Sequence, residues 1–475
     1  MSLRRMHDMA QDHGTRPWWQ AVRGALRGTK HDYTTGPIGR SIFLLAIPMV
    51  LEMIMESLFA LSDVFFVARL GASAVATVGL TESMMIVVYT IAMGLAIAGT
   101  AVVARRVGER DADGAARAAV QMITLGVIAS VVIGIVGAVA APALLRAMGA
   151  TDDVLTTGTM FTRVLLGGSG TAFLLFVINA AFRGAGDAAV SMRVLWLANA
   201  INIVLGPMLI FGVGPFPQLG VTGAAIATTI GRGTGVCYAL WRLTRGSGHL
   251  RVTRAHLVFE LDTMRSMLRL SVNATFQVLV GSLSWMVLIR LMASFGSAAM
   301  AGYTIAVRMI MFAMLPAWGL GNAAATMVGQ ALGARNPDRA NAAVWTAARY
   351  NVVFLGLMGA IFMIFARPIV AGFTSDPAVT EVAVYGLRTM AAGFPFFAFG
   401  MVLTQAFNGA GDTRTPTNIN IAVFWAFELP LAWVLTTQTV MGSHAVFVSV
   451  LAAYTLLAAV SAVMFRRGAW RTQRV

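Results

Sequence analysis

The sequence predicts an all-α polytopic membrane protein, with twelve transmembrane helices in two pseudo-symmetric six-helix lobes. Three observations predict this class: long apolar runs, basic residues confined to alternate connections, and an internal repeat. Of the 475 residues, 58% are hydrophobic and only 12% are charged, with a mean hydropathy of +0.76. Soluble domains carry about 25% charged residues, so this chain has too few polar groups to cover a water-exposed surface.

Apolar runs long enough to cross a bilayer, which takes about 20 residues, recur along the whole chain. They must be helices, because in lipid the backbone has to satisfy its own hydrogen bonds. We predict an N-lobe (41–243) and a C-lobe (267–465), joined by a basic linker (244–266) and flanked by a basic N-tail (1–40) and C-tail (466–475). The twelve predicted spans are 41–67, 77–104, 118–141, 157–181, 190–212, 221–243, 267–292, 302–328, 344–366, 381–406, 415–437 and 444–465.

Basic residues predict the orientation. With the N-terminus in the cytoplasm, the tails and the even-numbered connections hold most of the arginines, and the connections on the other side hold only Arg69, Arg146 and Arg367. This asymmetry predicts a multi-pass protein of the inner (plasma) membrane with both termini cytoplasmic. The net charge of +15 then faces the anionic leaflet, so we expect the lipid bilayer and no nucleic acid as a partner.

The segment 15–30, TRPWWQAVRGALRGTK, has two interpretations. Trp18, Trp19, Val22 and Leu26 share one face of a helix that arginines flank, which is typical of an interfacial amphipathic helix. The alternative is a disordered basic tail that only helps to set the topology. The single cysteine, Cys237, excludes an intramolecular disulfide.

An internal repeat appears when the chain is shifted by 225 residues. LGASAVATVGL (70–80) then falls on FGSAAMAGYTI (295–305), and FRGAGD (182–187) falls on FNGAGD (407–412). Each half has six spans, so both halves enter the membrane from the same side, and a pseudo-two-fold axis along the membrane normal relates them. Substrate sites of such folds lie at the interface between the repeats, near the midplane. We interpret the two Gly-Ala-Gly-Asp segments as turns between helices.

Three carboxylates lie on one face of the first predicted helix. Glu52 and Glu56 are four residues apart, and Asp63 follows seven residues later. At about 100° and 1.5 Å per residue they form one stripe over about 16 Å. Because a buried acid costs about 2.5–3.5 kcal/mol or more at mid-bilayer, an intramembrane acid is a functional hypothesis. We therefore expect the stripe to face a protein cavity, where it can hold protons, Na⁺ or a cationic substrate.

Each of these acids also has a structural interpretation. Asp63 lies near the outer end and can cap the helix or reach the surface, and Glu52 and Glu56 can form a protonated structural pair. The repeat favours function, because it has Gln277, Gly281 and Leu288 at the three equivalent positions.

Pro48, one turn before Glu52, removes a backbone hydrogen bond and predicts a kink. The kink is either a proton-sensitive hinge or a static bend.

Two asparagines of the fifth predicted helix, Asn199 and Asn202, can serve a helix-1 carboxylate as ligands or hydrogen-bond partners. The alternative is interhelical packing through hydrogen bonds.

In the second half, Glu428 is the one deep acid, and we expect it to line a C-lobe cavity together with Gln277. Glu82 and Arg308 begin helices 2 and 8 at similar depth. They form either an extracellular latch between the halves or ordinary contacts of helix ends with the surface.

The motifs, taken together, are similar to those of the multidrug and toxic compound extrusion (MATE) transporters. They are LAIPM…LSDVFFVARLG in helix 1, VARRVGERD and VGQALGARN after helices 2 and 8, and FRGAGD and FNGAGD. The resemblance covers about residues 34–465. It implies two six-helix lobes around a V-shaped cleft, and export of amphipathic, often cationic compounds in exchange for H⁺ or Na⁺.

The resemblance also implies residue roles. Asp63 matches the family's cation-binding aspartate of helix 1, Pro48 matches its helix-1 proline, and Asn202 matches its helix-5 asparagine. If Na⁺ is the coupling ion, the resemblance implies that Asp63 and Asn202 are its ligands. The chain departs from the pattern at Gly206, where the family has a second carboxylate. The acids that some members carry on helices 7 and 10 are absent as well, with Gln277 on helix 7.

We therefore expect a monomeric exporter of amphipathic, mainly cationic small molecules, with no cofactor other than the coupling ion. A lipid-linked precursor flippase of the same broader superfamily is the alternative, although such proteins have basic cavities and the deep charges here are acidic.

An enzyme is not expected, because the chain lacks His-Glu-x-x-His and Gly-x-Ser-x-Gly motifs. The pair Asp152-Asp153 could be read as a metal site, but it lies in a short outer loop.

Overall fold

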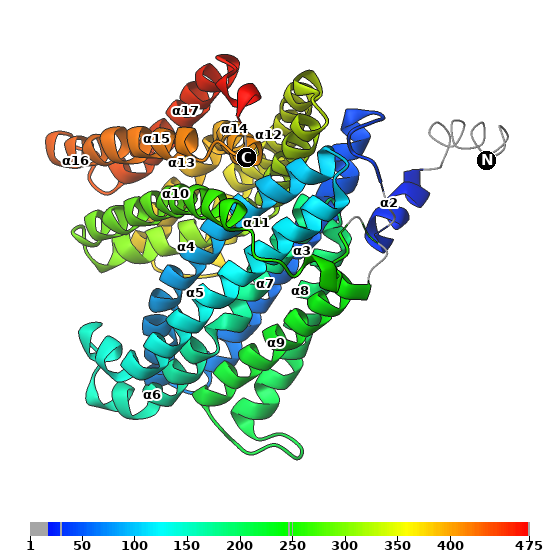
Figure 1. Ribbon diagram of the computed structural model, residues 1–475. Helices are drawn as coiled ribbons and strands as arrows, with labels where there is room; N and C mark the ends of the chain where they lie inside the picture. Colours follow the sequence, from blue (N-terminus) through cyan, green and yellow to red (C-terminus); the bar gives the residue numbers. More distant parts are fainter. Residues whose placement is uncertain (1–17, 29–30, 246–247, 249, 474–475) are drawn as a thin grey trace, which may run out of the picture.

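A computed structural model describes residues 18–28, 31–245, 248 and 250–473, and the regular secondary structure of these residues is helical. The predicted helix of the N-tail is present as α2 (Trp18–Arg27), and the part of the tail before Trp18 lies outside the described residues. Figure 1 shows one group of helices formed by α5–α9 and another formed by α12–α17, with α3, α4, α10 and α11 between them.

The helices follow the predicted spans closely. The first half contains α3 (Ile38–Ala68), α4 (Ala72–Gly108), α5 (Ala112–Ala147), α6 (Asp152–Gly167), α7 (Ser169–Gly184), α8 (Ala188–Phe211) and α9 (Val221–Arg245). The second half contains α10 (Leu261–Ala293), α11 (Ser297–Gly333), α12 (Pro337–Ala371), α13 (Pro377–Ala392), α14 (Phe394–Ala410), α15 (Arg414–Asn420), the π-helix η2 (Ile421–Glu428), α16 (Leu429–Gln438) and α17 (His444–Arg466). Two short 3₁₀ turns, η1 (Arg254–His256) and η3 (Ala469–Thr472), lie in the linker and the C-tail.

Two predicted spans are each broken into two helices. The span 157–181 is interrupted at Gly168, and 381–406 is interrupted at Gly393, where the two helices are bent by 52°. Both breaks are at a glycine, and the two glycines are equivalent in the repeat.

Within the described residues, ten helices are long and apolar enough to cross a membrane, or eleven if the bent pair is one span. The predicted span 221–243 is also a helix, α9, but it is less apolar because it carries Arg232 among glycines and threonines. It packs against α6, α7 and α8, so contacts within the protein compensate for its polar residues.

The internal repeat is visible in the backbone conformation. Three pairs of residues, each pair 225 positions apart, adopt left-handed backbone angles: Gly71 (φ 97°) and Gly296 (94°), Arg110 (61°) and Arg335 (55°), and Gly186 (85°) and Gly411 (86°). Arginine rarely adopts such a φ. That two arginines do so after equivalent helices shows that the two halves share one fold.

The lobes meet through α3, α4, α10 and α11, because α11 packs on both α3 and α4, and α10 packs on α4. The closest approach is at the end of the bundle where α2 and the C-tail lie, here called the tail end. A Cβ on Gly108 would overlap the Gln330 carbonyl oxygen, and a Cβ on Gly333 would overlap that of Arg105. The two groups of helices diverge toward the opposite end (Figure 1).

A first prediction concerns this contact. Gly108→Leu is expected to separate the lobes at the tail end, because any side chain there meets the Gln330 backbone. Spin labels at Ala112→Cys and Ala334→Cys, in a Cys237→Ser background, should report longer distances in the variant. Gly79→Leu is the matched control, since no atom lies within 4 Å of a Cβ built there. Unchanged distances in Gly108→Leu would show that the contact does not hold the lobes together.

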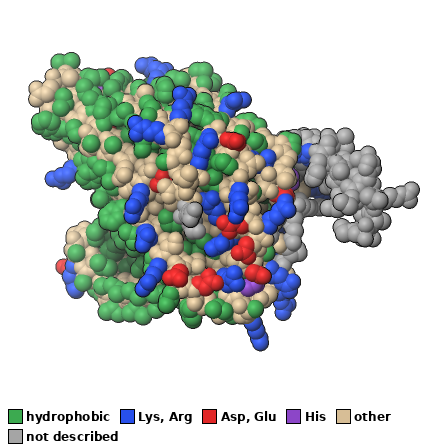
Figure 2. Space-filling model, turned by 45° about the horizontal axis from the view of Figure 1, so that its top comes forward, with side chains coloured by type: hydrophobic (Ala, Val, Ile, Leu, Met, Phe, Trp, Pro, Cys, Tyr) green, Lys and Arg blue, Asp and Glu red, His purple; other side chains and the backbone are tan. Residues whose placement is uncertain are grey.

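Charged and apolar side chains are segregated on the surface. Figure 2 shows arginine side chains gathered on the middle of one face, and hydrophobic side chains covering the two projecting parts. Exposed apolar residues such as Val139, Leu61 and Ile364 are 76%, 68% and 68% accessible. A surface of this kind is stable in contact with lipid, and the basic face fits the headgroup region.

Candidate functional site

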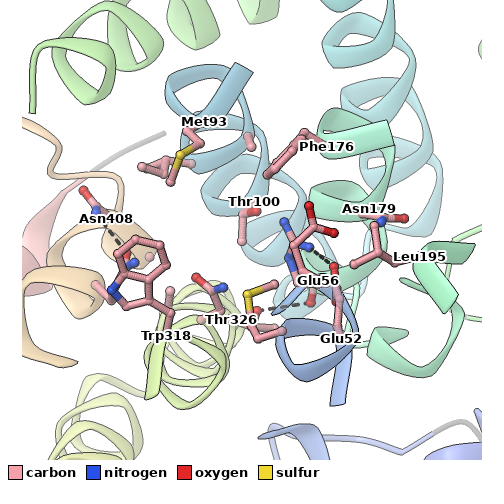
Figure 3. A pocket seen from close by; sticks show the side chains of 18 of the residues that line it. Glu52, Glu56, Met93, Thr100, Phe176, Asn179, Leu195, Trp318, Thr326 and Asn408 are labelled. Atoms are coloured by element: carbon pink, nitrogen blue, oxygen red, sulfur yellow. Dashed lines mark hydrogen bonds and ion pairs between the residues drawn. The ribbon is translucent and has the colours of Figure 1, made fainter. Parts of the chain in front are cut away.

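A cavity of about 200 Å³ lies between the two lobes. Residues of α3, α4, α7 and α8 line it on one side, and residues of α11 and α14 line it on the other. Its wall is mainly apolar, with Met93, Phe176 and Trp318 among the larger side chains (Figure 3). Glu52 and Glu56 supply the negative charge, and Arg183 supplies the positive charge.

Glu52 is the most buried charged group of this cavity, with an accessibility of 2%. It lies about 21 Å along α3 from Ile38, near the middle of the helix. Arg183 Nη1 donates to Glu52 Oε1 over 2.7 Å, and the Ser191 hydroxyl donates to Oε2 over 2.8 Å. Both carboxylate oxygens are therefore satisfied, and the buried charge is balanced by a guanidinium.

Arg183 connects this ion pair with the other lobe. It lies near the end of α7, in the FRGAGD segment, and its carbonyl oxygen accepts a hydrogen bond from the Thr326 hydroxyl of α11 over 3.1 Å. The next residue, Gly184, accepts one from Gln330 Nε2 over 3.0 Å. The sequence predicted only a turn at FRGAGD. In the structure, this segment also forms the ion pair with Glu52 and accepts two hydrogen bonds from α11 of the other lobe.

Glu56 belongs to a second charged group on the same lobe. Asn199 Nδ2 donates to Glu56 Oε2 over 3.0 Å, and Arg232 Nη2 lies 3.9 Å from Oε1. Arg232 also donates to the Tyr89 hydroxyl over 2.6 Å. Arg232 was missed by sequence reasoning. An arginine in the middle of a predicted membrane helix is a sufficient signal for it.

Asp63 lies farther along α3, about 8 Å from its end at Ala68. It is partly buried, and the charged groups in its electrostatic surroundings are Arg232 and Glu82. Asn202 is buried on α8 and donates to the Thr228 hydroxyl over 2.7 Å. Of the two predicted asparagines, Asn199 thus contacts a helix-1 carboxylate, and Asn202 contacts α9.

Pro48 lies inside α3, which continues as one helix from Ile38 to Ala68. Next to it, α11 approaches the α3 backbone closely, since a Cβ on Gly319 would lie 2.8 Å from the Val50 nitrogen. Pro48 therefore lies where α3 contacts α11 of the other lobe, one helical turn before Glu52.

The remaining predicted residues lie elsewhere. Glu428 is buried inside the C-lobe rather than on the wall of the inter-lobe cavity, and the backbone oxygen of Gln277 accepts a hydrogen bond from Asn420. Glu82 and Arg308 are both exposed, and within the described residues no ion pair joins them. In this conformation the expected latch is not formed.

Both chain tails cross the tail end of the lobe contact. The Arg339 guanidinium donates to the backbone oxygens of Tyr33, Thr35 and Gly36 over 3.0, 2.7 and 2.9 Å. The Tyr33 ring is buried, and burial, followed by the nearby Asp187 carboxylate, raises the pKa of its phenol. On the other tail, Arg105 donates to the Gln473 carbonyl over 2.6 Å. The tails therefore reinforce the contact that closes this end.

The sequence and the fold were compared with known proteins. The MatE family model matches residues 48–208 and again residues 274–434, one copy in each lobe. The chain belongs to the MatE family. The two copies confirm the predicted repeat, and the family confirms the predicted all-α, two-lobe fold class.

Several relatives of the chain are named as multidrug resistance proteins or transporters. A probable multidrug resistance protein NorM of Thermotoga maritima is 23% identical over 92% of this chain and 94% of its own length. An FAD transporter of Shewanella oneidensis is 25% identical over 85% of this chain and 89% of its own. A solved structure described as the outward-facing conformation of a multidrug resistance MATE family transporter superposes with a TM-score of 0.87, at 26% identity, over 93% of this chain and 98% of that one. This MatE protein is accordingly a multi-pass membrane transporter of the multidrug-efflux type.

Proposed function

We propose that the protein exports amphipathic, mainly cationic compounds from the cytoplasm in exchange for protons. The observation that carries the proposal is the buried Glu52–Arg183 pair. It forms part of the wall of the inter-lobe cavity, and it is bonded through the Arg183 backbone to the opposite lobe. A change of charge at Glu52 therefore alters both the charge of the inter-lobe cavity and the contact between the lobes.

The cavity wall supports the substrate class. Its aromatic and thioether side chains, such as Trp318, Phe176 and Met93, offer apolar surface that adapts to many shapes. Its charged residues are two glutamates and one arginine, which leaves a net negative charge when all are ionised. Such a wall favours planar or apolar molecules that carry a positive charge.

The arginines favour a proton over Na⁺ as the coupling ion. Arg183 is paired with Glu52, and Arg232 lies beside Glu56 and acts electrostatically on Asp63. A sodium ion that entered this group would meet fixed positive charge on both sides. A proton binds to a carboxylate directly and needs no coordination shell, so it neutralises the acid without displacing the guanidinium.

A sequence of events follows from these contacts. With the tail end on the cytoplasmic side, as the basic residues predict, protonation of Glu52 from outside weakens its attraction to Arg183. The turn after α7 is then less firmly held against Thr326 and Gln330 of α11, and the tail end can open to the cytoplasm. Release of the proton there restores the ion pair and favours substrate binding in the negatively charged cavity.

Proteoliposomes test the proposal, because the pH gradient and the Na⁺ gradient can be imposed separately. We expect an acid-inside pH gradient to drive the accumulation of ethidium, and a Na⁺ gradient at constant pH to drive none. Flavin dinucleotide, which one relative is named for, serves as the anionic comparison. Accumulation driven by Na⁺ alone would contradict proton coupling. Transport of the anion without that of ethidium would contradict the substrate class.

A further inference from the structure

A second buried carboxylate lies inside the C-lobe, away from the cavity. Glu428, at the end of η2, is 3% exposed, and the Ser284 hydroxyl donates to its Oε2 over 3.0 Å. Tyr303 and Tyr454 are within its electrostatic reach. Both phenol oxygens are buried, and neither has a hydrogen-bond partner among the described residues. Because buried polar atoms are nearly always paired, two unpaired hydroxyls beside a buried acid indicate a site for a ligand.

The fold does not require this cluster. At the equivalent positions of the N-lobe, 225 residues earlier, three of the four side chains are apolar and the fourth is a threonine. In the order Ser284, Tyr303, Glu428 and Tyr454, the equivalents are Phe59, Val78, Ile203 and Thr229. The equivalent helices of the N-lobe pack with those residues in place, so helix packing does not need the polar cluster.

Glu428 differs from the acids of α3 in its charge balance. Glu52 and Glu56 each face an arginine, whereas within the described residues no lysine, arginine or histidine pairs with Glu428. In the neighbouring helices α10, α11 and α17, Arg308 lies five residues deeper along α11 than Tyr303 but is exposed, and the other charged residues lie closer to the helix ends, namely Asp262, Arg265, Arg269, Arg290, His444 and Arg466. An ionised carboxylate without a counter-charge is very costly at this depth, so neutralisation by a small cation would stabilise Glu428.

The backbone next to Glu428 is irregular as well. Residues 421–428 form a π-helix, a rare form that is frequent at functional sites. Pro430 follows it and has no amide hydrogen, so the regular hydrogen-bond ladder cannot continue through this position. Glu428 is thus held at the junction of two helical forms, in contact with α10 and α17.

We propose that Glu428, Ser284, Tyr303 and Tyr454 form a second proton-binding site, separate from the acids of α3. A protonated Glu428 becomes a hydrogen-bond donor, and the unpaired phenol oxygens can accept from it. An alkali ion would need several oxygens to present their lone pairs, whereas Ser284 already directs its hydrogen to the carboxylate. The cluster lies about 9–15 Å from the ends of α10, α11 and α17 that are opposite the tails. The proton therefore exchanges with the side of the membrane opposite the tails.

Infrared difference spectroscopy of the full-length protein in lipid tests the site directly. A pH change should alter the carbonyl stretching band of a buried protonated carboxylic acid. We expect Glu428→Gln to lose this band, and Ser284→Ala and Tyr454→Phe to keep it at a shifted frequency. Glu381→Gln removes an exposed acid of the same lobe and should leave the band unchanged.

The outcomes separate this site from the proposed coupling at α3. In a Glu52→Gln background the Glu428 band should persist, even if transport is lost. A pH difference spectrum that is identical in Glu428→Gln and in the unmodified protein would overturn the proposal. Loss of the band on adding Na⁺ at constant pH would overturn the proton as its ligand.

Discussion

Replacing Glu52 with glutamine is expected to abolish proton-driven efflux. The amide keeps the size of the side chain, but it cannot release a proton and it leaves the Arg183 guanidinium unpaired. Removing one partner of a buried ion pair costs about 3–5 kcal/mol, and every 1.4 kcal/mol is about tenfold in an equilibrium. We therefore expect the rate of ethidium accumulation under a pH gradient to fall by more than about a hundredfold, to the background of protein-free liposomes.

A surface ion pair of the same chemistry provides the control. Glu109 pairs with Arg106 over 3.1 Å, and both side chains are about 40% exposed. Exposed pairs contribute about 0–1 kcal/mol, so Glu109→Gln should retain transport. Full pH-driven transport by Glu52→Gln would rule out Glu52 as the coupling group, and transport lost equally in both variants would show that the assay reports insertion or stability instead.

Arg183→Asn is expected to have the second large effect. The repeat shows that the turn tolerates this change, since Asn408 occupies the equivalent position in FNGAGD. The substitution leaves the Glu52 carboxylate buried with only Ser191 as a donor, at a cost of about 3–5 kcal/mol while it is ionised. Glu52 is then protonated in the resting state, and the variant should lose pH-driven transport and stability together.

A double-mutant cycle measures this interaction. The combined variant Glu52→Gln with Arg183→Asn carries no buried charge at the pair, so it should be more stable to unfolding than Arg183→Asn alone. Transport should remain absent, because no titrating group has been restored. Strictly additive losses of stability in the two single variants would show that the residues do not interact, in conflict with the distance of 2.7 Å.

Several features of the site could be predicted from the residues. The acids of the first helix stood out because charges inside long apolar runs are costly, and the internal repeat showed that the fold does not need them. Arg232 could have been found in the same way, because it lies in the middle of the predicted span 221–243. Glu428 was recognised as a deep acid of the C-lobe, but its hydrogen bond with Ser284, 144 residues earlier, depends on how η2 packs against α10, which hydropathy does not report.

The sequence by itself determined the helices, their boundaries to within seven residues, and the two-fold repeat. These depend on local properties, namely the length of apolar runs, the position of glycines and the spacing of repeated motifs. Only the tertiary structure decided which charges meet. Glu52 and Arg183, which form the buried ion pair, are 131 residues apart. Thr326, whose hydroxyl donates to the Arg183 carbonyl, is 143 residues from Arg183. Such pairs form because two helix faces pack at a particular angle and depth, and no local pattern in the sequence encodes that packing.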